Sequence, residues 1–546
     1  MMISLKMFSI KTYLHFLVGS FLVVLVCTFG VSSAVAATLA WNIPGAVITQ
    51  SANGANFYPR VVVDGSGNTT AVWFAQSGSN TVLFSTTRPA GGSWSAPSTL
   101  YSLPAGSGTF FGSSDIAVTP SGEVIVVWTS AENNQSIQYV HSVSKPAGGS
   151  WTAVENLTSG TSLADAHVAI DANGNASVIW KFQNGQNFVI QSVSKNSGGS
   201  WSSVVDLSQA VGIDTDTPRI VIDSSGSSTA TWLQYDTTSF VYSIVSASKS
   251  LNGSWTGPTV LATSAQGAYH PGIVVAPNGT VTALWTIYGQ NGLLLQSADL
   301  PQGGSWSSPV TISNPSNSVY EQQMNVNSNG DIVAIWRTYT NSGGGGTVIQ
   351  SITRTSGASW NTPVNLSIPN PNGAFGPEVV IDSSGNTTAT WGIFDQNYNE
   401  VAQTSSKPVG GAWETAIDLI GPGQLSGFLH PSIAVNQNGD VVAICNYRDS
   451  QGNYILAAFD AILPVSAPTP TPTPSSSGSG STPSATPSSQ PTIAGSETST
   501  PLAYTGFKLN IPLIFIGLVA LLFGLSLTSY RIFRKRSLIN EKTDVL

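Results

Sequence analysis

Charged side chains and cysteine are both scarce in this sequence. The first shortage argues against a nucleic-acid-binding protein, and the second excludes a fold stabilised by disulfides. Only 8% of the 546 residues are charged, and 19 basic against 27 acidic side chains give a formal net charge of −8. Because a nucleic-acid surface needs clustered positive charge, we expect no nucleic-acid partner. The two cysteines are Cys27, inside the first apolar stretch, and Cys445. Without a disulfide, the protein must rely on a large buried core.

The first apolar stretch has the layout of a secretory signal peptide. Lys6 and Lys11 precede the run "LHFLVGSFLVVLVCTFGV", and "SSAVAA" then offers a small-x-small cleavage site. A basic start, an apolar centre and small residues before the cut are typical of such peptides. We therefore predict a signal peptide at residues 1–36. The alternative is an uncleaved signal anchor, since the apolar run is long for a signal.

Composition changes again near the C-terminus. Pro, Ser and Thr dominate residues 464–501, which contain almost no large apolar side chain. Such a segment cannot bury enough surface to offset its chain entropy, so we predict a disordered stalk. An apolar run at about 511–530 and the basic "RIFRKR" follow. This pattern predicts one transmembrane helix with a cytoplasmic basic tail.

A pentapeptide stands between stalk and helix: Leu502, Ala503, Tyr504, Thr505 and Gly506. With the signal, stalk, helix and basic tail, it resembles the sorting signal of sortase-anchored bacterial surface proteins. The resemblance implies that sortase cuts between Thr505 and Gly506 and attaches Thr505 to the cell wall. Ala503 replaces the usual proline, as in the LAxTG variant of the LPxTG motif. The segment 502–546 is thus predicted to anchor the protein at the bacterial cell surface, and the alternative is a plain single-pass anchor.

Two phrases recur about every fifty residues between signal and stalk. The first has alternating apolar residues, a turn with glycine and a run that ends in Trp, as in "VVVDGSGNTTAVW". Its glycine recurs at spacings of 51 to 55 residues, as Gly67, Gly122, Gly174, Gly226, Gly279, Gly330, Gly385 and Gly439. Each unit shows four short strand-like stretches and no helical periodicity. The fold class is therefore all-β, and we predict an eight-bladed β-propeller at residues 37–463.

The two ends of the repeat region complement each other. A strand-like stretch at residues 41–48 has no strands before it, and the last unit, ending in "YILAAFDAIL", lacks a fourth strand. If the N-terminal strand completes the last blade, the ring closes and no sheet edge stays exposed. We predict this closure. The alternative is an open solenoid with two partial blades.

The first phrase also contains "DxxG", as in Asp64 to Gly67. An Asp side chain accepts backbone N–H bonds at the start of a turn, and Gly supplies a positive φ. The alternative is a calcium loop, but the bidentate Glu and flanking helices of that motif are missing. We therefore predict structural turns and no bound metal or cofactor.

The second phrase has the spacing Ser144, Pro146, Gly148, Ser150, Trp151. It resembles the Asp-box of sialidases and related propellers, with Pro146 where the box has Asp. The resemblance implies a hairpin between the third and fourth strands, with its Trp packed between blades far from the active centre. We expect these Trp rings in the core. A basic residue stands six positions earlier in most copies, at Arg88, Lys145, Lys195, Lys249, Arg354 and Lys407, and is expected to be part of the scaffold.

Function is expected where the repeats differ from one another. Unlike polar residues begin the first strand of each unit or follow the second strand, which places them on one face of a propeller, around its channel. Five tyrosines in the loops after the second strand share that face and suit sugar or peptide recognition: Tyr235, Tyr288, Tyr339, Tyr398 and Tyr447. The candidate ligand-binding residues are Arg60, Asp115, His167, Arg219, His270, Glu321, Arg337, Glu378, His430 and Arg448.

The favoured hypothesis is a monomeric, surface-anchored adhesin or lectin-like propeller that binds an extracellular glycan or protein and has no catalytic residues.

A competing hypothesis is a sialidase-like glycoside hydrolase. The resemblance would then imply that three arginines clamp a carboxylate of the substrate: Arg60, Arg219 and either Arg337 or Arg448. Glu321 or Glu378 would assist a Tyr nucleophile, and Asp115 or Asp165 would serve as the acid. Two observations argue against a sialidase. The sequence lacks the Arg-Ile-Pro phrase of the sialidase family, and sialidases have six blades where this sequence predicts eight. Two further hypotheses are metal binding by His167, His270 and His430, and a passive surface-layer role.

Overall fold

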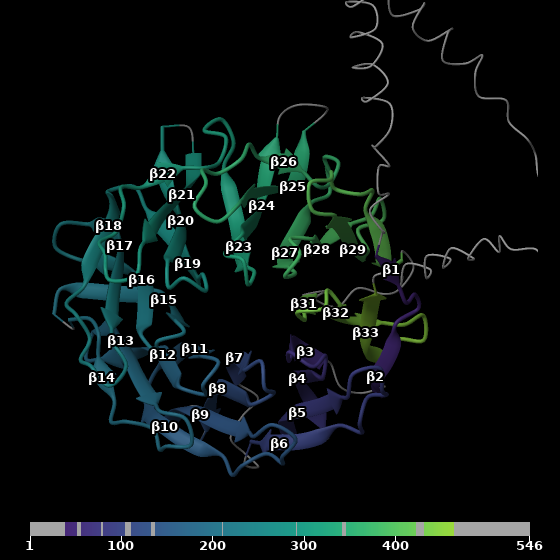
Figure 1. Cartoon of the computed structure of the whole chain (residues 1–546), viewed down its shortest axis with the longest axis horizontal. Helices are drawn as coiled ribbons and strands as arrows, with labels where there is room; N and C mark the ends of the chain where they lie inside the picture. Colours follow the sequence, from purple (N-terminus) through teal and green to yellow (C-terminus); the bar gives the residue numbers. More distant parts are fainter. Residues whose placement is uncertain are drawn as a thin grey trace, which may run out of the picture. The chain divides into compact units, whose positions relative to one another are not determined.

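All regular elements in the described part of the chain are β-strands. The computed structural model describes residues 39–51, 56–77, 80–103, 111–132, 137–209, 211–290, 292–340, 345–421 and 431–462, which belong to the unit Met1–Thr469. They form eight antiparallel sheets arranged as blades around a central axis (Figure 1). The predicted eight-bladed propeller is therefore confirmed. The predicted signal peptide, stalk, pentapeptide and transmembrane helix lie outside the described residues.

Each of the first seven blades contains four consecutive strands. Blades 1 to 4 are β3 (Asn56–Val63), β4 (Thr69–Ser77), β5 (Asn80–Arg88), β6 (Ser98–Ser102); β7 (Phe111–Val118), β8 (Val124–Glu132), β9 (Ile137–Lys145), β10 (Glu155–Gly160); β11 (Leu163–Ile170), β12 (Ala176–Asn184), β13 (Asn187–Lys195), β14 (Val205–Asp206); and β15 (Ile213–Ile222), β16 (Ser228–Asp236), β17 (Val241–Lys249), β18 (Thr259–Ser264). Blades 5 to 7 are β19 (Ala268–Val275), β20 (Val281–Gly289), β21 (Gly292–Leu300), β22 (Val310–Thr311); β23 (Val319–Val326), β24 (Ile332–Thr340), β25 (Gly346–Arg354), β26 (Val364–Asn365); and β27 (Ala374–Ile381), β28 (Thr387–Phe394), β29 (Glu400–Lys407), β30 (Ile417–Ile420). The first strand of each blade lies nearest the axis (Figure 1).

The N-terminal strand closes the ring, as predicted. Blade 8 contains β31 (Ser432–Val435), β32 (Val441–Arg448) and β33 (Tyr454–Ile462), and both β1 (Ala40–Trp41) and β2 (Ala46–Ser51) pair with β33. The predicted single strand at 41–48 is wrong in its bounds, because it is split in two. Pro44, which has no N–H for the ladder, lies in the break.

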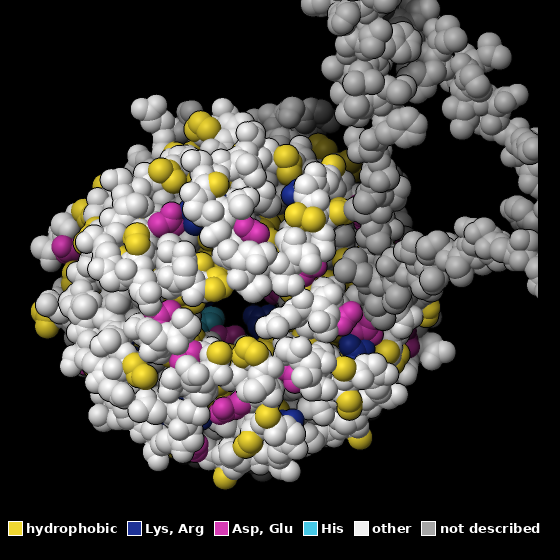
Figure 2. Space-filling model, viewed as in Figure 1, with side chains coloured by type: hydrophobic (Ala, Val, Ile, Leu, Met, Phe, Trp, Pro, Cys, Tyr) yellow, Lys and Arg dark blue, Asp and Glu magenta, His cyan; other side chains and the backbone are white. Residues whose placement is uncertain are grey.

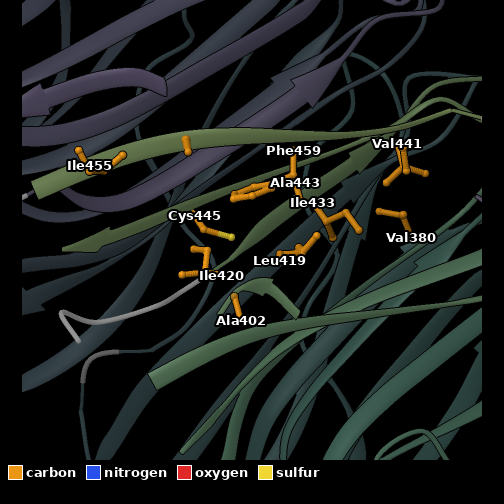
Figure 3. Packing of buried hydrophobic residues seen from close by; sticks show 12 residues of the cluster. Val380, Ala402, Leu419, Ile420, Ile433, Val441, Ala443, Cys445, Ile455 and Phe459 are labelled. Carbon is orange, nitrogen blue, oxygen red and sulfur yellow. The ribbon is translucent and has the colours of Figure 1, made fainter. Parts of the chain in front are cut away.

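A tryptophan in the second strand anchors the core of each of the first seven blades. These seven rings are almost completely buried: Trp73, Trp128, Trp180, Trp232, Trp285, Trp336 and Trp391. Cys445 of β32 is the buried counterpart in blade 8, where it packs with Leu419, Ile420 and Phe459 (Figure 3). The alternating pattern of the repeats thus becomes a row of cores between neighbouring blades.

The "DxxG" segments form the expected turns between the first and second strands. In blade 1, Oδ1 of Asp64 accepts hydrogen bonds from the backbone N–H of Ser66 (2.9 Å) and Asn68 (2.8 Å). Gly67 has a φ of 86°, a conformation in which a Cβ would be strained. All eight repeat glycines have a positive φ, so the sequence pattern specified this turn correctly.

The "GGSW" phrase forms the hairpin between the third and fourth strands. Its tryptophans pack between blades against the hydrophobic cores, as expected, but they are half-buried rather than fully buried core residues. Trp413 of blade 7, for example, donates a hydrogen bond to Ser351 Oγ of blade 6 (2.9 Å). The guanidinium of Arg354 lies 4.7 Å from the centre of the Trp360 ring and binds both carboxylate oxygens of Asp299 in the neighbouring blade. This basic position therefore belongs to the scaffold.

Candidate functional site

A bulge near the start of the first strand shapes the mouth of the channel. In each of the first seven blades, pairing between the first and second strands shifts register at this point. Non-glycine residues adopt a positive φ there, among them Asp165 (52°), His270 (51°) and Glu321 (53°). Because a bulge re-aims side chains locally, residues that sequence alternation alone would place on the sheet faces turn toward the opening.

Five of the predicted residues line one pocket of about 520 Å³ at this mouth. They are Arg60, Arg219, His270, Glu321 and Glu378, and each comes from a different blade. Figure 2 shows the central opening of the ring, with basic and histidine side chains inside it. Ring closure thus brings together residues that are more than three hundred positions apart in the sequence.

Arg60 and Glu378 face each other without a direct hydrogen bond. Nη1 of Arg60 lies 3.8 Å from Oε1 of Glu378, which is longer than a hydrogen bond. Oε2 of Glu378 accepts a bond from the backbone N–H of Ile433 (3.2 Å). Burial raises the pKa of Glu378, although the charge of Arg60 opposes this shift. Both side chains therefore keep hydrogen-bonding capacity for a ligand.

Three of the predicted residues form a hydrogen-bonded chain across blades 2, 3 and 4. Nδ1 of His167 lies 3.1 Å from Asp115 Oδ2, and Nε2 lies 2.7 Å from Arg219 Nη1. A guanidinium only donates, so Nε2 accepts, and Nδ1 carries the proton that it donates to Asp115. Burial, followed by the charge of Arg219, lowers the pKa of His167. The chain holds a neutral imidazole that orients Arg219 at the pocket.

The ends of this chain are also fixed. Burial alone would raise the pKa of Asp115, but the hydrogen bonds from His167 and from the backbone of Val168 lower it. Nη1 of Arg219 donates a second bond to the carbonyl oxygen of Pro218 (2.8 Å). Burial lowers the pKa of His270 and the charge of Arg219 adds to this effect, so a second neutral imidazole lies at the pocket wall.

Arg337 lies beside the pocket and holds one of its acids. Its Nη2 is 3.1 Å from Oε1 of Glu321, and its guanidinium lies 5.5 Å from the centre of the Tyr320 ring. Oε2 of Glu321 accepts a bond from the N–H of Gly376 in the next blade (2.9 Å). Lys181 makes an equivalent contact with Asp216, 3.1 Å away. These cations position acidic groups at the rim.

Of the candidates that the structure describes, Arg448 lies apart from the pocket. Arg448 lies 4.2 Å from the centre of the Tyr454 ring and donates to its hydroxyl, which places it within blade 8. His430 lies outside the described residues. Of the nine described candidates, five line the pocket, and Asp115, His167 and Arg337 connect to it through Arg219 or Glu321.

Three tyrosines that the sequence analysis did not select lie at the pocket or connect to its wall: Tyr58, Tyr242 and Tyr269. The centre of the Tyr242 ring lies 4.5 Å from that of Tyr235 and 5.9 Å from that of Tyr269, in tilted arrangements, and the centre of the Tyr269 ring lies 6.2 Å from that of His270. Tyr58, 52% exposed, also lines the pocket. Tyr58 lies in the bulge of blade 1, and Tyr269 directly precedes the bulge of blade 5. Their place at the start of the first strand is the sequence signal that would have pointed to the channel mouth.

The described ranges contain neither a metal-type cluster nor a membrane-spanning helix. No group of three or more His, Cys, Asp or Glu side chains there has a metal-binding arrangement. His167, moreover, uses both ring nitrogens in hydrogen bonds. No helix in these ranges has the length and apolar character needed to cross a bilayer.

No protein-family model and no curated protein matches the chain. Among solved structures, a protein of unknown function from Dyadobacter fermentans is 14% identical over 78% of this chain and 99% of that one, with a TM-score of 0.34. A lectin from Burkholderia pseudomallei is 15% identical over 70% and 99%, with a TM-score of 0.40. An ulvan lyase, a polysaccharide lyase, is 10% identical over 78% and 94%, with a TM-score of 0.42. Likenesses this distant assign no function.

Proposed function

We propose that the protein is a binding module that takes an extracellular carbohydrate at the channel-mouth pocket. The observation that carries this proposal is the convergence of Arg60, Arg219, His270, Glu321 and Glu378 from five blades into one pocket. None of these positions is needed for the repeated turns or hairpins. A mixture of donors and acceptors beside tyrosine rings suits a ligand rich in hydroxyl groups.

Two features support binding rather than hydrolysis. His167 and Arg219 are held by hydrogen bonds to protein groups, and Arg337 is bound to Glu321 rather than directed at the pocket beside Arg60 and Arg219. A hydrolase would need a nucleophile and an acid in mutual reach, and of the two pocket carboxylates Glu321 has both oxygens bound, by Arg337 and by the N–H of Gly376. A sialidase-like hydrolase is the second candidate, because arginines and acids do share the pocket.

A glycan array that includes sialylated and cell-wall sugars tests this proposal. The purified full-length protein should bind selected glycans, and the variant Arg60→Ala/Arg219→Ala should lose that binding. Loss of terminal sialic acid from the spots would favour the hydrolase. A blank array would reject carbohydrate binding and leave a protein ligand or the passive surface role.

We further propose that residues 37–463 are displayed at the bacterial surface by the predicted signal peptide, stalk and sorting signal. The support is the order of these segments in the sequence, with "LAYTG" directly before the apolar run. Fractionation of cells that express wild type or Thr505→Ala tests the sortase step. Wild type should enter the cell-wall fraction and the variant should stay with the membrane. Equal membrane retention of both would indicate a plain single-pass anchor.

A further inference from the structure

Four consecutive blades each present one exposed aromatic side chain near the loop after their second strand. These are Phe240, Tyr288, Tyr339 and Tyr398, with 65%, 43%, 54% and 69% of their surface exposed. Because strands alternate in direction within each blade, these loops lie on the same face as the starts of the first strands. The four residues therefore share the face of the channel-mouth pocket. We call them the aromatic arc.

The arc covers the same blades that supply most of the pocket. Blades 4, 5, 6 and 7 provide one arc residue each, and they also provide Arg219, His270, Glu321 and Glu378. In blades 3 and 8 the corresponding loops are described too, but their nearby aromatics, Phe182, Phe188 and Tyr447, are half-buried. The exposed rings thus accompany the pocket around the ring rather than recurring with every repeat.

The backbone holds two of these rings outward at a cost. Phe240 and Tyr398 have φ values of 59° and 61°, in the left-handed region that non-glycine residues rarely adopt. Their turns are closed by hydrogen bonds from Phe240 N–H to the carbonyl of Asp236 (2.8 Å) and from Tyr398 N–H to that of Asp395 (3.0 Å). Strain and solvent exposure together are unfavourable for an aromatic residue unless a partner covers it.

The composition of the arc favours a sugar chain over a protein surface. Polar residues such as Thr238, Ser239 and Asn397 stand next to the rings, so the arc is a row of separate rings instead of the continuous apolar centre of a protein interface. Three of the rings are tyrosines, which combine a flat apolar face with a hydroxyl group. A ligand that contacts rings on four blades must extend across those blades, as a polysaccharide chain does.

We propose that the aromatic arc is an extended subsite that holds sugar units of a polysaccharide, another unit of which occupies the channel-mouth pocket. This inference rests on the proposed function and specifies its ligand as a polymer rather than a terminal sugar. The pocket supplies polar recognition of one unit, and the arc supplies stacking along the chain.

Calorimetric titration of the full-length protein with oligosaccharides of increasing length tests the arc. The probes are cello-, chito- and oligogalacturonate series, each from the monosaccharide to the hexasaccharide. Affinity for the recognised series should rise with length. Replacing each ring by Ala should weaken hexasaccharide binding by about twofold to tenfold while leaving binding of the monosaccharide unchanged. Tyr288→Phe, Tyr339→Phe and Tyr398→Phe, which keep the ring, should retain most of the affinity.

Val409→Ala is the matched control, since Val409 is 63% exposed but lies in a hairpin on the opposite face. It should bind every oligosaccharide as wild type does. Affinity independent of chain length, with pocket binding intact, would overturn the arc and leave the proposed function standing. Absence of binding to every glycan probe and to the array would reject both. Capture of a protein that the quadruple Ala variant no longer binds would reassign the arc to a protein partner and overturn the polysaccharide.

Discussion

Arg219 donates a hydrogen bond to Nε2 of His167 across 2.7 Å, and this contact determines the protonation state of the imidazole. A protonated His167 would have no lone pair at Nε2 and would place a positive charge directly against the guanidinium. The orientation of Arg219 at the pocket therefore depends on a neutral His167. Asp115, on the other side of the ring, fixes the tautomer.

Stability should fall as the pH drops below neutrality. Burial lowers the pKa of His141, His167 and His270 below the ordinary value of 6.5. Below about pH 6.5 the unfolded chain therefore binds more protons than the folded chain. The stabilising contribution of these neutral histidines is fully present above about pH 6.5 and is lost as the pH falls through their folded-state pKa values. Urea unfolding at several pH values between neutral and mildly acidic measures this slope. His167→Gln should reduce the slope, and an unchanged slope would contradict the neutral His167.

The pocket arginines and the scaffold arginines should behave in opposite ways. Arg60→Ala/Arg219→Ala removes half-buried groups at the channel mouth, outside the hydrophobic cores, so binding should be lost while the melting temperature stays nearly unchanged. Arg354→Ala removes the bidentate contact with Asp299 and should lower stability by about 1.5–3 kcal/mol with binding retained. Differential scanning calorimetry and the glycan array measure the two effects. Equal loss of fold in the double variant would argue against the mouth as a functional site.

Closure of the ring can be tested at one glycine. A Cβ on Gly45 would lie 2.6 Å from the carbonyl oxygen of Ala458 in β33, whereas a Cβ on Gly257 would meet no atom within 4 Å. Gly45→Ala should therefore destabilise the protein by about 1–3 kcal/mol through its effect on blade 8. Gly257→Ala, the matched control, should change stability by less than about 0.5 kcal/mol. If both variants unfold at the same urea concentration, the N-terminal strand does not contribute to closure.

The buried tryptophans should dominate the stability of single blades. Trp336 is completely buried, and its Nε1 donates to Oε1 of Gln350 (3.1 Å). Trp336→Ala leaves a large cavity and an unpaired amide, so the free energy of unfolding should fall by about 3–5 kcal/mol. Trp360→Ala, at a half-buried hairpin position, should cost less. A larger loss for Trp360 in chemical denaturation would mean that the seams, rather than the blade cores, carry the stability.

The sequence was sufficient to predict the scaffold because its signals are local. Alternation of apolar side chains, Asp64 and Gly67 in a turn, and a tryptophan at a constant place recur within each unit, and each follows from backbone geometry over a few residues. The incomplete first and last units also predicted that the N-terminal strand pairs in blade 8. Even the face that carries Tyr288, Tyr339 and Tyr398 followed from strand direction.

What the tertiary structure decided is which of those residues meet. Arg60 and Glu378 approach each other because the ring closes, and the bulges turn Glu321 and His270 toward the opening in a way that strand alternation does not encode. The same sequence pattern could not separate Arg337, which binds Glu321, from Arg448, which binds Tyr454. Local patterns specify blades, whereas the pocket depends on side chains that are distant in sequence, and only the closed ring brings these together.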